Sequence, residues 1–418
     1  MKTRLLIRNG QVITPGGVRP GEVAVTGGAI AEIRECGAAA DGAAAGDAAA
    51  ADAGAADARG GPVVLDAGGA FVAPGFLDLH VHGAAGGDAM SGDPESVRLM
   101  ARNLAKWGTT AFCPATEAAQ PAELLRAVES CGAAVDRSLM PGWGGAQVLG
   151  VHIEGPYLNP IRRGAQPLEC LRAPDLGETR ELYAAARGAV SIVSLAPELP
   201  GAIPVIEWLA GQGVRVSAAH SDATWEECER GADAGVDHAT HLFNGMRPMH
   251  HREPGVAGFA LADDRIWVEI ICDGHHVHPG MIRVAWGAKG PERLGVVSDL
   301  TAISGLPDGV YLFAGHEVIL SNGTVTTRDG GNLAGSAMPA CRVFANLLSW
   351  GFSPVEASAL MSLNPARHLG LDGRKGSVEA GKDADITIIR ADGTVLATIA
   401  GGEVVHEADG VERLDVGG

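Results

Sequence analysis

The chain has 418 residues, more than a single domain usually holds, so we expect one large domain and one smaller domain. Its 32 Lys and Arg against 50 Asp and Glu give a formal net charge of -18, which disfavours nucleic-acid binding because most of the surface would repel a phosphate backbone. No run approaches the roughly 18 to 20 apolar residues of a membrane span, and the opening MKTRLLIRNGQVI is too short in its apolar run for a secretory signal, so we expect no membrane attachment and no export.

Both ends of the chain are typical of short β-strands. Residues 1–73 contain short runs of alternating apolar and polar residues separated by NG, GG and PG turns, and residues 381–418 show the same pattern. Within the first block, residues 37–61 consist of Ala, Gly and Asp without periodicity or large side chains, which indicates a flexible surface insertion. We therefore expect residues 1–73 and 381–418 to meet in one small β-sandwich domain.

Residues 74–380 alternate apolar runs of strand length with segments that suit helices. Eight such runs predict a parallel sheet, and over this length an α/β fold of the (β/α)8 TIM-like barrel type fits better than an open doubly wound sheet. Most runs end in His, Asp, Glu or Asn, which is where the carboxyl face of a barrel places its catalytic groups. The runs are FLDLHVHG, TTAFCPAT, VLGVHIEGP, VSIVSLAPE, VRVSAAHSD, DHATHLFN, IWVEIICDGHH and LGVVSDLTA.

The seven cysteines are scattered along the chain without a CxxC pair. An odd number without close spacing favours reduced thiols, and with them a cytoplasmic location.

The first apolar run of the barrel segment ends in an HxH pair. Residues two apart on a strand point to the same side, so the side chains of His80 and His82 could share one ion. A single histidine in an apolar strand is more often hydrogen-bonded in the core, but the pair at a strand end favours metal binding.

Later strand ends add further ligand candidates. Glu154 lies in an apolar run, where a carboxylate is costly unless it binds a cation or is paired. His220 and His241 end two later runs, and with Glu154 they form the three-ligand set with an open position that is typical of hydrolytic metal sites. His152 either orients a metal ligand or is a core histidine whose nitrogens are hydrogen-bonded, and we give the two interpretations equal weight. His238 would point to the opposite strand face, and we interpret it as structural.

Asp299 closes the eighth predicted strand. A carboxylate beside a metal-bound water suits a general base that later protonates the leaving group. The alternative is a structural cap on the following loop, since Asp readily bonds nearby backbone donors.

Two loops indicate how a substrate is held. FNGMRPMHHREPG contains Asn244, Gly245 and Arg252 beside two histidines, the local positive cluster that an anionic group would need against the negative background. On its own such a cluster is usually a solvated loop. CDGHHVHPG places three histidines at the seventh strand end, where one imidazole could contact substrate and at least two are expected to be structural or exposed.

The order of these motifs resembles the N-acetylglucosamine-6-phosphate deacetylase family of the amidohydrolase superfamily. The resemblance covers nearly the whole chain except the Ala-rich insertion; HxH alone marks the superfamily, whereas HIEGP, THLFN and HREPG in this order are more specific. It implies a metal-dependent barrel with a small β-sandwich that deacetylates an N-acetylated amino-sugar phosphate. It also implies one or two divalent ions per chain, zinc first, with iron, manganese or cobalt as alternatives, and a homodimer.

The resemblance also implies roles for individual residues. Glu154, His220 and His241 would hold the principal metal, and Asp299 would activate the attacking water and protonate the departing amine. VSIVSLAPE contains no lysine, so a ligand that bridges two ions must be Glu154, and His80 and His82 then decide whether a second ion binds. The implied substrate contacts are Asn244, the backbone of Gly245 and Arg252 for the phosphate, with Arg252 able to reach the neighbouring subunit's site, and His276 for the sugar.

Two positions depart from the family pattern. Gln166 stands where histidine is common, near the expected mouth of the site, and bears on which sugar is accepted. Gly245 stands where alanine is usual, a mild change because the implied contact is through the backbone. The rival functions are deacetylation of a related N-acyl amino sugar such as N-acetylgalactosamine 6-phosphate, another amidohydrolase activity, and a noncatalytic barrel that serves as a binding module. The last is disfavoured because all the predicted ligands and the base are present.

Overall fold

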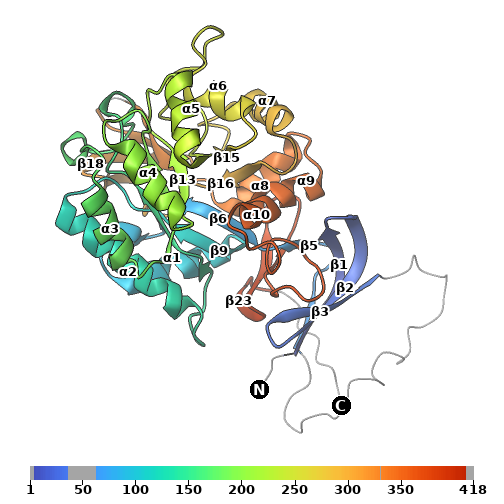
Figure 1. The fold of residues 1–418 in the computed structure, drawn as a ribbon. Helices are drawn as coiled ribbons and strands as arrows, with labels where there is room; N and C mark the ends of the chain where they lie inside the picture. The colour runs from blue at the N-terminus through green and yellow to red at the C-terminus, as the bar shows by residue number, and fades with distance from the viewer. Residues whose placement is uncertain (1–3, 36–62, 330, 411–418) are drawn as a thin grey trace, which may run out of the picture.

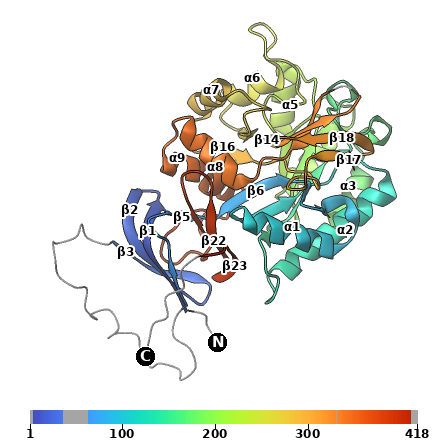
Figure 2. The ribbon, with the colours of Figure 1, turned by 180° about the vertical axis from the view of Figure 1, so that it is seen from behind.

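The computed structural model describes residues 4–35, 63–329 and 331–410. An α/β body carries a smaller β-sheet to which both chain ends contribute (Figures 1 and 2). The predicted insertion 37–61 and Cys36 lie outside the described residues. The six cysteines that the structure describes are buried and unpaired, in line with the expected reduced thiols.

Eight parallel strands form a TIM-barrel-like sheet; seven lie within a predicted run, and β14 begins one residue before its run. Strands β11 to β16 pair in chain order, and β6 pairs with β9. Isolated bridges join the remaining edges, Ala115 with His152 and Val81 with Leu300. This sequential order lacks the reversal of a doubly wound sheet, which excludes that alternative. The strands are β6 (Phe76–Val81), β9 (Thr109–Pro114), β11 (Val151–Glu154), β12 (Val190–Leu195), β13 (Arg215–Ala218), β14 (Val236–Ala239), β15 (Trp267–Ile271) and β16 (Leu294–Val297).

The helices alternate with these strands and lie around the sheet (Figure 1). Their starts follow from local sequence: Thr224 and Glu227 form a capping box at the start of α5, and Asp93 caps α1 ahead of a proline. None of the described helices has the length and apolar character that crossing a bilayer requires. The helices are α1 (Pro94–Lys106), α2 (Pro121–Ser138), α3 (Leu176–Ala185), α4 (Ala202–Gly211), α5 (Trp225–Ala234), α6 (Gly255–Ala262), α7 (Pro279–Lys289), α8 (Ala340–Ser349), α9 (Pro354–Ser358) and α10 (Asn364–His368).

Strands from both chain ends share one sheet. β5 pairs in parallel with β1 and antiparallel with β21, so the first and last segments of the chain lie side by side (Figures 1 and 2). Their apolar side chains form one core cluster that includes Ile7, Val23 and Ile386. The sandwich form and the limits 1–73, 74–380 and 381–418 stay predictions. The strands are β1 (Arg4–Thr14), β2 (Gly17–Thr26), β3 (Ala29–Glu35), β4 (Val63–Asp66), β5 (Phe71–Pro74), β21 (Ile386–Ile389), β22 (Val395–Ala400) and β23 (Glu403–Glu407).

A four-stranded antiparallel sheet follows β16, which the sequence analysis did not predict. It contacts the barrel-like sheet through Leu300, which forms a bridge with Ser336 as well as with Val81. Its strands are β17 (Gly309–Phe313), β18 (His316–Ser321), β19 (Thr324–Thr327) and β20 (Leu333–Ser336); the short strands β7 (Gly83–Ala84), β8 (Gly87–Asp88) and β10 (Gln147–Val148) complete the set.

Candidate metal centre

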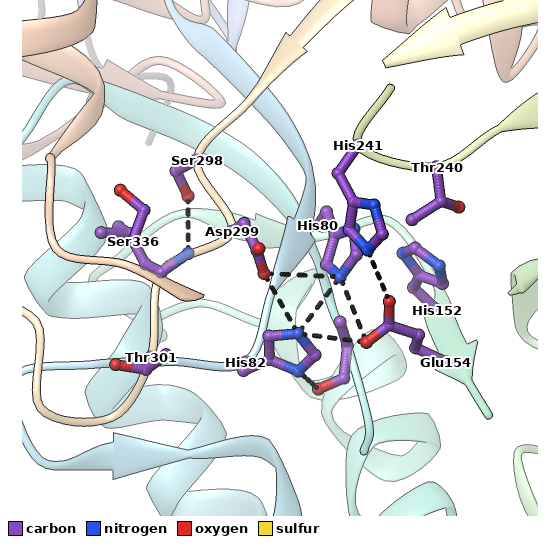
Figure 3. Close-up of polar contacts among 12 residues, drawn as sticks. His80, His82, His152, Glu154, Thr240, His241, Ser298, Asp299, Thr301 and Ser336 are labelled. Atoms are coloured by element: carbon purple, nitrogen blue, oxygen red, sulfur yellow. Dashed lines mark hydrogen bonds and ion pairs between the residues drawn. The ribbon is translucent and has the colours of Figure 1, made fainter. Parts of the chain in front are cut away.

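The predicted ligands and the predicted base come together at the carboxyl ends of the parallel strands. Figure 3 shows all of them except His220. Glu154 is the last residue of β11, and the others lie at or shortly after the ends of β6, β13, β14 and β16. Every one of the six side chains is buried. They form two groups, Glu154 with His220 and His241, and His80 with His82 and Asp299.

The first group converges on one point. Glu154 Oε1 lies 3.2 Å from His220 Nε2 and 3.2 Å from His241 Nε2. The two imidazole nitrogens are themselves 3.2 Å apart. Three ligand atoms thus form a nearly equilateral triangle.

The second group lies beside the first. His80 Nε2 is 3.2 Å from His82 Nε2, and Asp299 Oδ1 is 3.2 Å from His82 Nε2. Glu154 presents its other oxygen, Oε2, to this group, at 3.4 Å from His82 Nε2 and 3.7 Å from His80 Nε2. Glu154 therefore lies between the two groups, one oxygen facing each (Figure 3).

These separations fit divalent ions. Ligands at about 2.0–2.1 Å from a tetrahedral zinc lie about 3.3 Å from one another, close to the 3.2 Å measured here. Two Nε2 atoms that face each other at this distance share at most one proton between them, whereas two lone pairs directed at one cation are satisfied. The donor set of imidazoles and carboxylates suits zinc, iron, manganese or cobalt.

Hydrogen bonds on the far side of the rings set their orientation. His82 Nδ1 bonds the carbonyl of Ala115 at 3.1 Å, and His220 Nδ1 bonds the carbonyl of Arg162 at 2.8 Å. An acceptor at Nδ1 favours the tautomer that carries its proton there, which leaves the Nε2 lone pair directed into the site.

The electrostatics of the cluster favour charged groups despite the burial. Burial alone would raise the pKa of Glu154, but His80, His220 and His241 outweigh it and hold that pKa well below its usual value. Burial likewise opposes ionisation of Asp299, yet His80 and His82 lower its pKa. Both carboxylates are therefore ionised near neutral pH, as metal binding requires.

Three of these residues have strained backbones. His220, His241 and Asp299 have φ angles of 43°, 31° and 53°, in the left-handed region that non-glycine residues rarely occupy. Such strain costs about 1–3 kcal/mol per residue and is found at functional sites, where it aims side chains that regular strands would direct elsewhere.

A cavity adjoins the two groups, and it contains most of the predicted substrate contacts. Asn244, Gly245 and His276 line it, and His276 Nδ1 is 2.6 Å from Asp273 Oδ2. Arg252 does not line it: its side chain is exposed and donates to His251 Nε2 at 2.8 Å. The cluster predicted from FNGMRPMHHREPG is thus only partly at the cavity of its own chain.

Gly245 is less interchangeable with alanine than its backbone contact suggests. Its φ is 60°, and an added Cβ would lie 2.7 Å from His220 Nδ1. An alanine here requires His220 to move.

Gln166 is the cavity residue that stands where histidine is common. Its Oε1 accepts from the backbone N–H of Ala118, and its Nε2 donates to Glu154 Oε2, each at 2.8 Å. The fixed amide orientation makes Gln166 a donor to the central carboxylate.

The sequence analysis missed other residues at the cavity. Glu117 lines it, and burial raises the pKa of this carboxyl to about 7. It follows the second predicted run directly, so the strand-end pattern could have found it. Phe313 and Leu333 also line the cavity, but they come from the unpredicted sheet β17–β20.

Two further histidines are now placed. His152 bonds the carbonyl of Leu79 at 3.0 Å and Ser194 Oγ at 2.7 Å, so both its nitrogens point away from the ligand atoms, although its ring contacts that of His80. His238 does not lie on an opposite face: its Nε2 is 3.2 Å from Glu269 Oε2, beneath the site.

The chain is similar to known proteins over most of its length. The sequence profile of the amidohydrolase family matches residues 71–405. The N-acetylgalactosamine-6-phosphate deacetylase of Escherichia coli O157:H7 is 39% identical over 319 residues, 76% of this chain and 83% of that protein. The N-acetylglucosamine-6-phosphate deacetylase of Bacillus subtilis is 38% identical over 348 residues, 80% of this chain and 85% of that protein. A mutant N-acetyl-D-glucosamine-6-phosphate deacetylase of Mycobacterium smegmatis, solved with N-acetyl-D-glucosamine-6-phosphate, superposes with a TM-score of 0.83 at 30% identity, covering 96% of this chain and 99% of that one.

Proposed function

The chain belongs to the amidohydrolase family, and from that premise we propose that it hydrolyses N-acetyl-D-glucosamine 6-phosphate to glucosamine 6-phosphate and acetate. One observation carries the proposal: Glu154 lies between two histidine groups at the base of a cavity whose wall includes Asn244 and His276. The relatives named above act on phosphorylated N-acetyl amino sugars, so the chemistry of the site and the substrates of the relatives agree.

We propose that Glu154, His220 and His241 hold the principal ion, zinc first among the candidates, and that His80 and His82 hold a second ion that shares Glu154. A divalent ion at such a site supplies Lewis-acid chemistry, which lowers the pKa of water and polarises the acetyl carbonyl. The amidohydrolase family is metal-dependent, and the distances between ligand atoms support both positions.

Asp299 is the proposed general base and acid. Its lowered pKa keeps it unprotonated, able to accept the proton of the attacking water. The same carboxyl then donates that proton to the departing nitrogen, which leaves as the free amine. His276, held by Asp273, is in position to bond the sugar, while Asn244 and the backbone N–H of Gly245 are proposed to bind the phosphate.

The remaining predictions extend this proposal. We propose a cytoplasmic homodimer in which Arg252 reaches the partner's cavity; its exposure in one chain, away from its own cavity, supports that role. We also propose the full (β/α)8 barrel with a β-sandwich of both chain ends, supported by the bridges between strand edges and by the shared core of the terminal sheet.

A second candidate substrate is N-acetylgalactosamine 6-phosphate, which the 39% identical relative favours. The test compares kcat/KM for the two phosphorylated epimers and for unphosphorylated N-acetylglucosamine, with acetate as the measured product. We expect the glucosamine epimer to be the best substrate. A higher kcat/KM for the galactosamine epimer would transfer the assignment to it, and equal rates with the unphosphorylated sugar would overturn phosphate recognition.

A further inference from the structure

Glu269 is a buried carboxylate beneath the candidate metal centre to which no motif assigns a role. It lies in the middle of β15, and its side chain is fully buried. An ionised carboxylate at such a place is costly unless its oxygens are paired. Its partners therefore show why the chain keeps it there.

One oxygen of Glu269 contacts both ligand groups. Oε1 lies 2.8 Å from His80 Nδ1 and accepts the backbone N–H of His241 at 3.0 Å. His80 belongs to one group and His241 to the other, so a single atom fixes the ring of one ligand and the backbone of a second.

The other oxygen faces His238 at an ion-pair distance without forming a hydrogen bond. Oε2 lies 3.2 Å from His238 Nε2, and the ring of His238 packs against Trp267 and His368. The hydrogen bonds that hold this carboxylate are therefore those of Oε1, and Glu269 is not among the residues that line the cavity.

The consequence for His80 follows from the chemistry of imidazole. The acceptor at Nδ1 favours the tautomer with its proton on that nitrogen, so the Nε2 lone pair faces His82, Asp299 and Glu154. Without that acceptor, His80 is free to carry its proton on Nε2, where it blocks metal binding.

We propose that Glu269 is a positioning residue: it fixes the metal-binding tautomer of His80 and ties the His80 group to the backbone of His241. This inference rests on the proposed metal centre but not on the identity of the sugar.

The test measures cobalt binding in the full-length protein without substrate. Glu269→Leu removes both acceptor oxygens, and Glu269→Asp keeps the charge but withdraws it from His80. Each is loaded with Co²⁺, and bound metal, affinity by chelator competition and the visible cobalt spectrum are recorded. We expect affinity to fall about 10- to 100-fold at the His80 group, with metal content moving from two towards one ion per chain.

Asp78→Asn is the matched control. Asp78 is another buried carboxylate beneath the site, but it accepts from the backbone N–H groups of His80 and Ser298, at 3.4 and 3.1 Å, and not from the ring of His80. It should bind cobalt as the unaltered protein does. The proposal would be overturned if cobalt content, affinity and spectrum were unchanged in both Glu269 variants. It would also be overturned if replacing His80 itself left the cobalt content unchanged. Two variants guard against one failing to fold, and because no substrate is used, a failed deacetylase assignment leaves the result readable.

Discussion

At the scale of single residues, Glu154 is the centre of the site, because each of its two oxygens faces one group of ligands. Glu154 lies in an apolar run and His220 and His241 follow at the ends of two later runs, so placement and ligand chemistry together predicted that the three would converge. Glu269 carries the same signal as Glu154, a carboxylate within an apolar strand, but no motif marks it. His238 was misplaced because strand alternation was extended to His241, whereas β14 ends at Ala239 and the backbone of His241 has a positive φ.

The first prediction concerns the HxH pair. Replacing His80 and His82 together by Asn removes two imidazole ligands of the second group and leaves Glu154, His220 and His241 intact. We expect its metal content, measured by elemental analysis, to fall from two towards one ion per chain, while the ion held by Glu154, His220 and His241 stays bound. Loss of all metal in the double variant, with the fold retained, would contradict this prediction.

The second prediction concerns Asp299. Asp299→Asn preserves the size of the side chain but cannot accept a proton from water, so kcat should fall about 10²- to 10⁴-fold. Because Glu154, His220 and His241 remain, at least one ion should stay bound. A variant that keeps both its metal and an undiminished kcat would remove Asp299 from the mechanism.

At the scale of elements, the parallel strands were predicted because they lie in short apolar runs and are mostly buried. Sheet β17–β20 was not predicted, because antiparallel partners are determined by pairing across the sheet and none of its four strands ends in a His, Asp, Glu or Asn. The four strands nevertheless matter for function, since Phe313 and Leu333 form part of the cavity wall.

The third prediction tests that sheet. Phe313 lines the cavity, whereas its neighbour Leu312 is 73% exposed. Phe313→Ala should raise KM for the sugar phosphate several-fold by removing apolar contact area, and Leu312→Ala should not. Steady-state kinetics on the two variants and the unaltered protein measure this. A KM of Phe313→Ala equal to that of the unaltered protein would show that Phe313 does not contact the substrate.

At the scale of the whole molecule, the length of the chain predicted a large and a small domain. The shared sheet of the two chain ends was predicted from the short alternating strands and turns that both ends contain. The residues that Arg252 would contact in a neighbouring subunit could not be predicted, because a contact between subunits produces no hydrophobic periodicity in the sequence of one chain. Buried charges beneath the site also act on the stability of the whole molecule.

The fourth prediction concerns pH. Burial raises the pKa of Asp78 from 3.8 to about 6. A carboxyl whose pKa is higher in the folded state does not lower the free energy of unfolding below its unfolded pKa. The loss of stability grows as pH rises from about 4 to about 6 and reaches about 3 kcal/mol. Asp78→Asn should therefore raise the melting temperature at pH 8 and leave it nearly unchanged at pH 4. A shift of equal size at both values would contradict the assigned pKa.

The fifth prediction concerns the homodimer. If Arg252 acts in the partner's cavity, mixing the inactive Asp299→Asn chain with Arg252→Ala chains should restore activity on the phosphorylated sugar, because one cavity of each mixed dimer regains both groups. Subunit exchange followed by an acetate assay measures this. No gain on mixing, although mixed dimers form, would place Arg252 in its own chain's site or outside the function.

The central claim is a metal-dependent deacetylase built on Glu154, and one measurement tests it most directly. Acetate release from N-acetyl-D-glucosamine 6-phosphate is followed with the metal-loaded protein, after removal of metal by a chelator, and after restoration of zinc, with metal content determined in parallel. We predict that activity falls with the metal and returns with it. Activity indifferent to chelation, or a fully loaded protein that releases no acetate, would contradict the account.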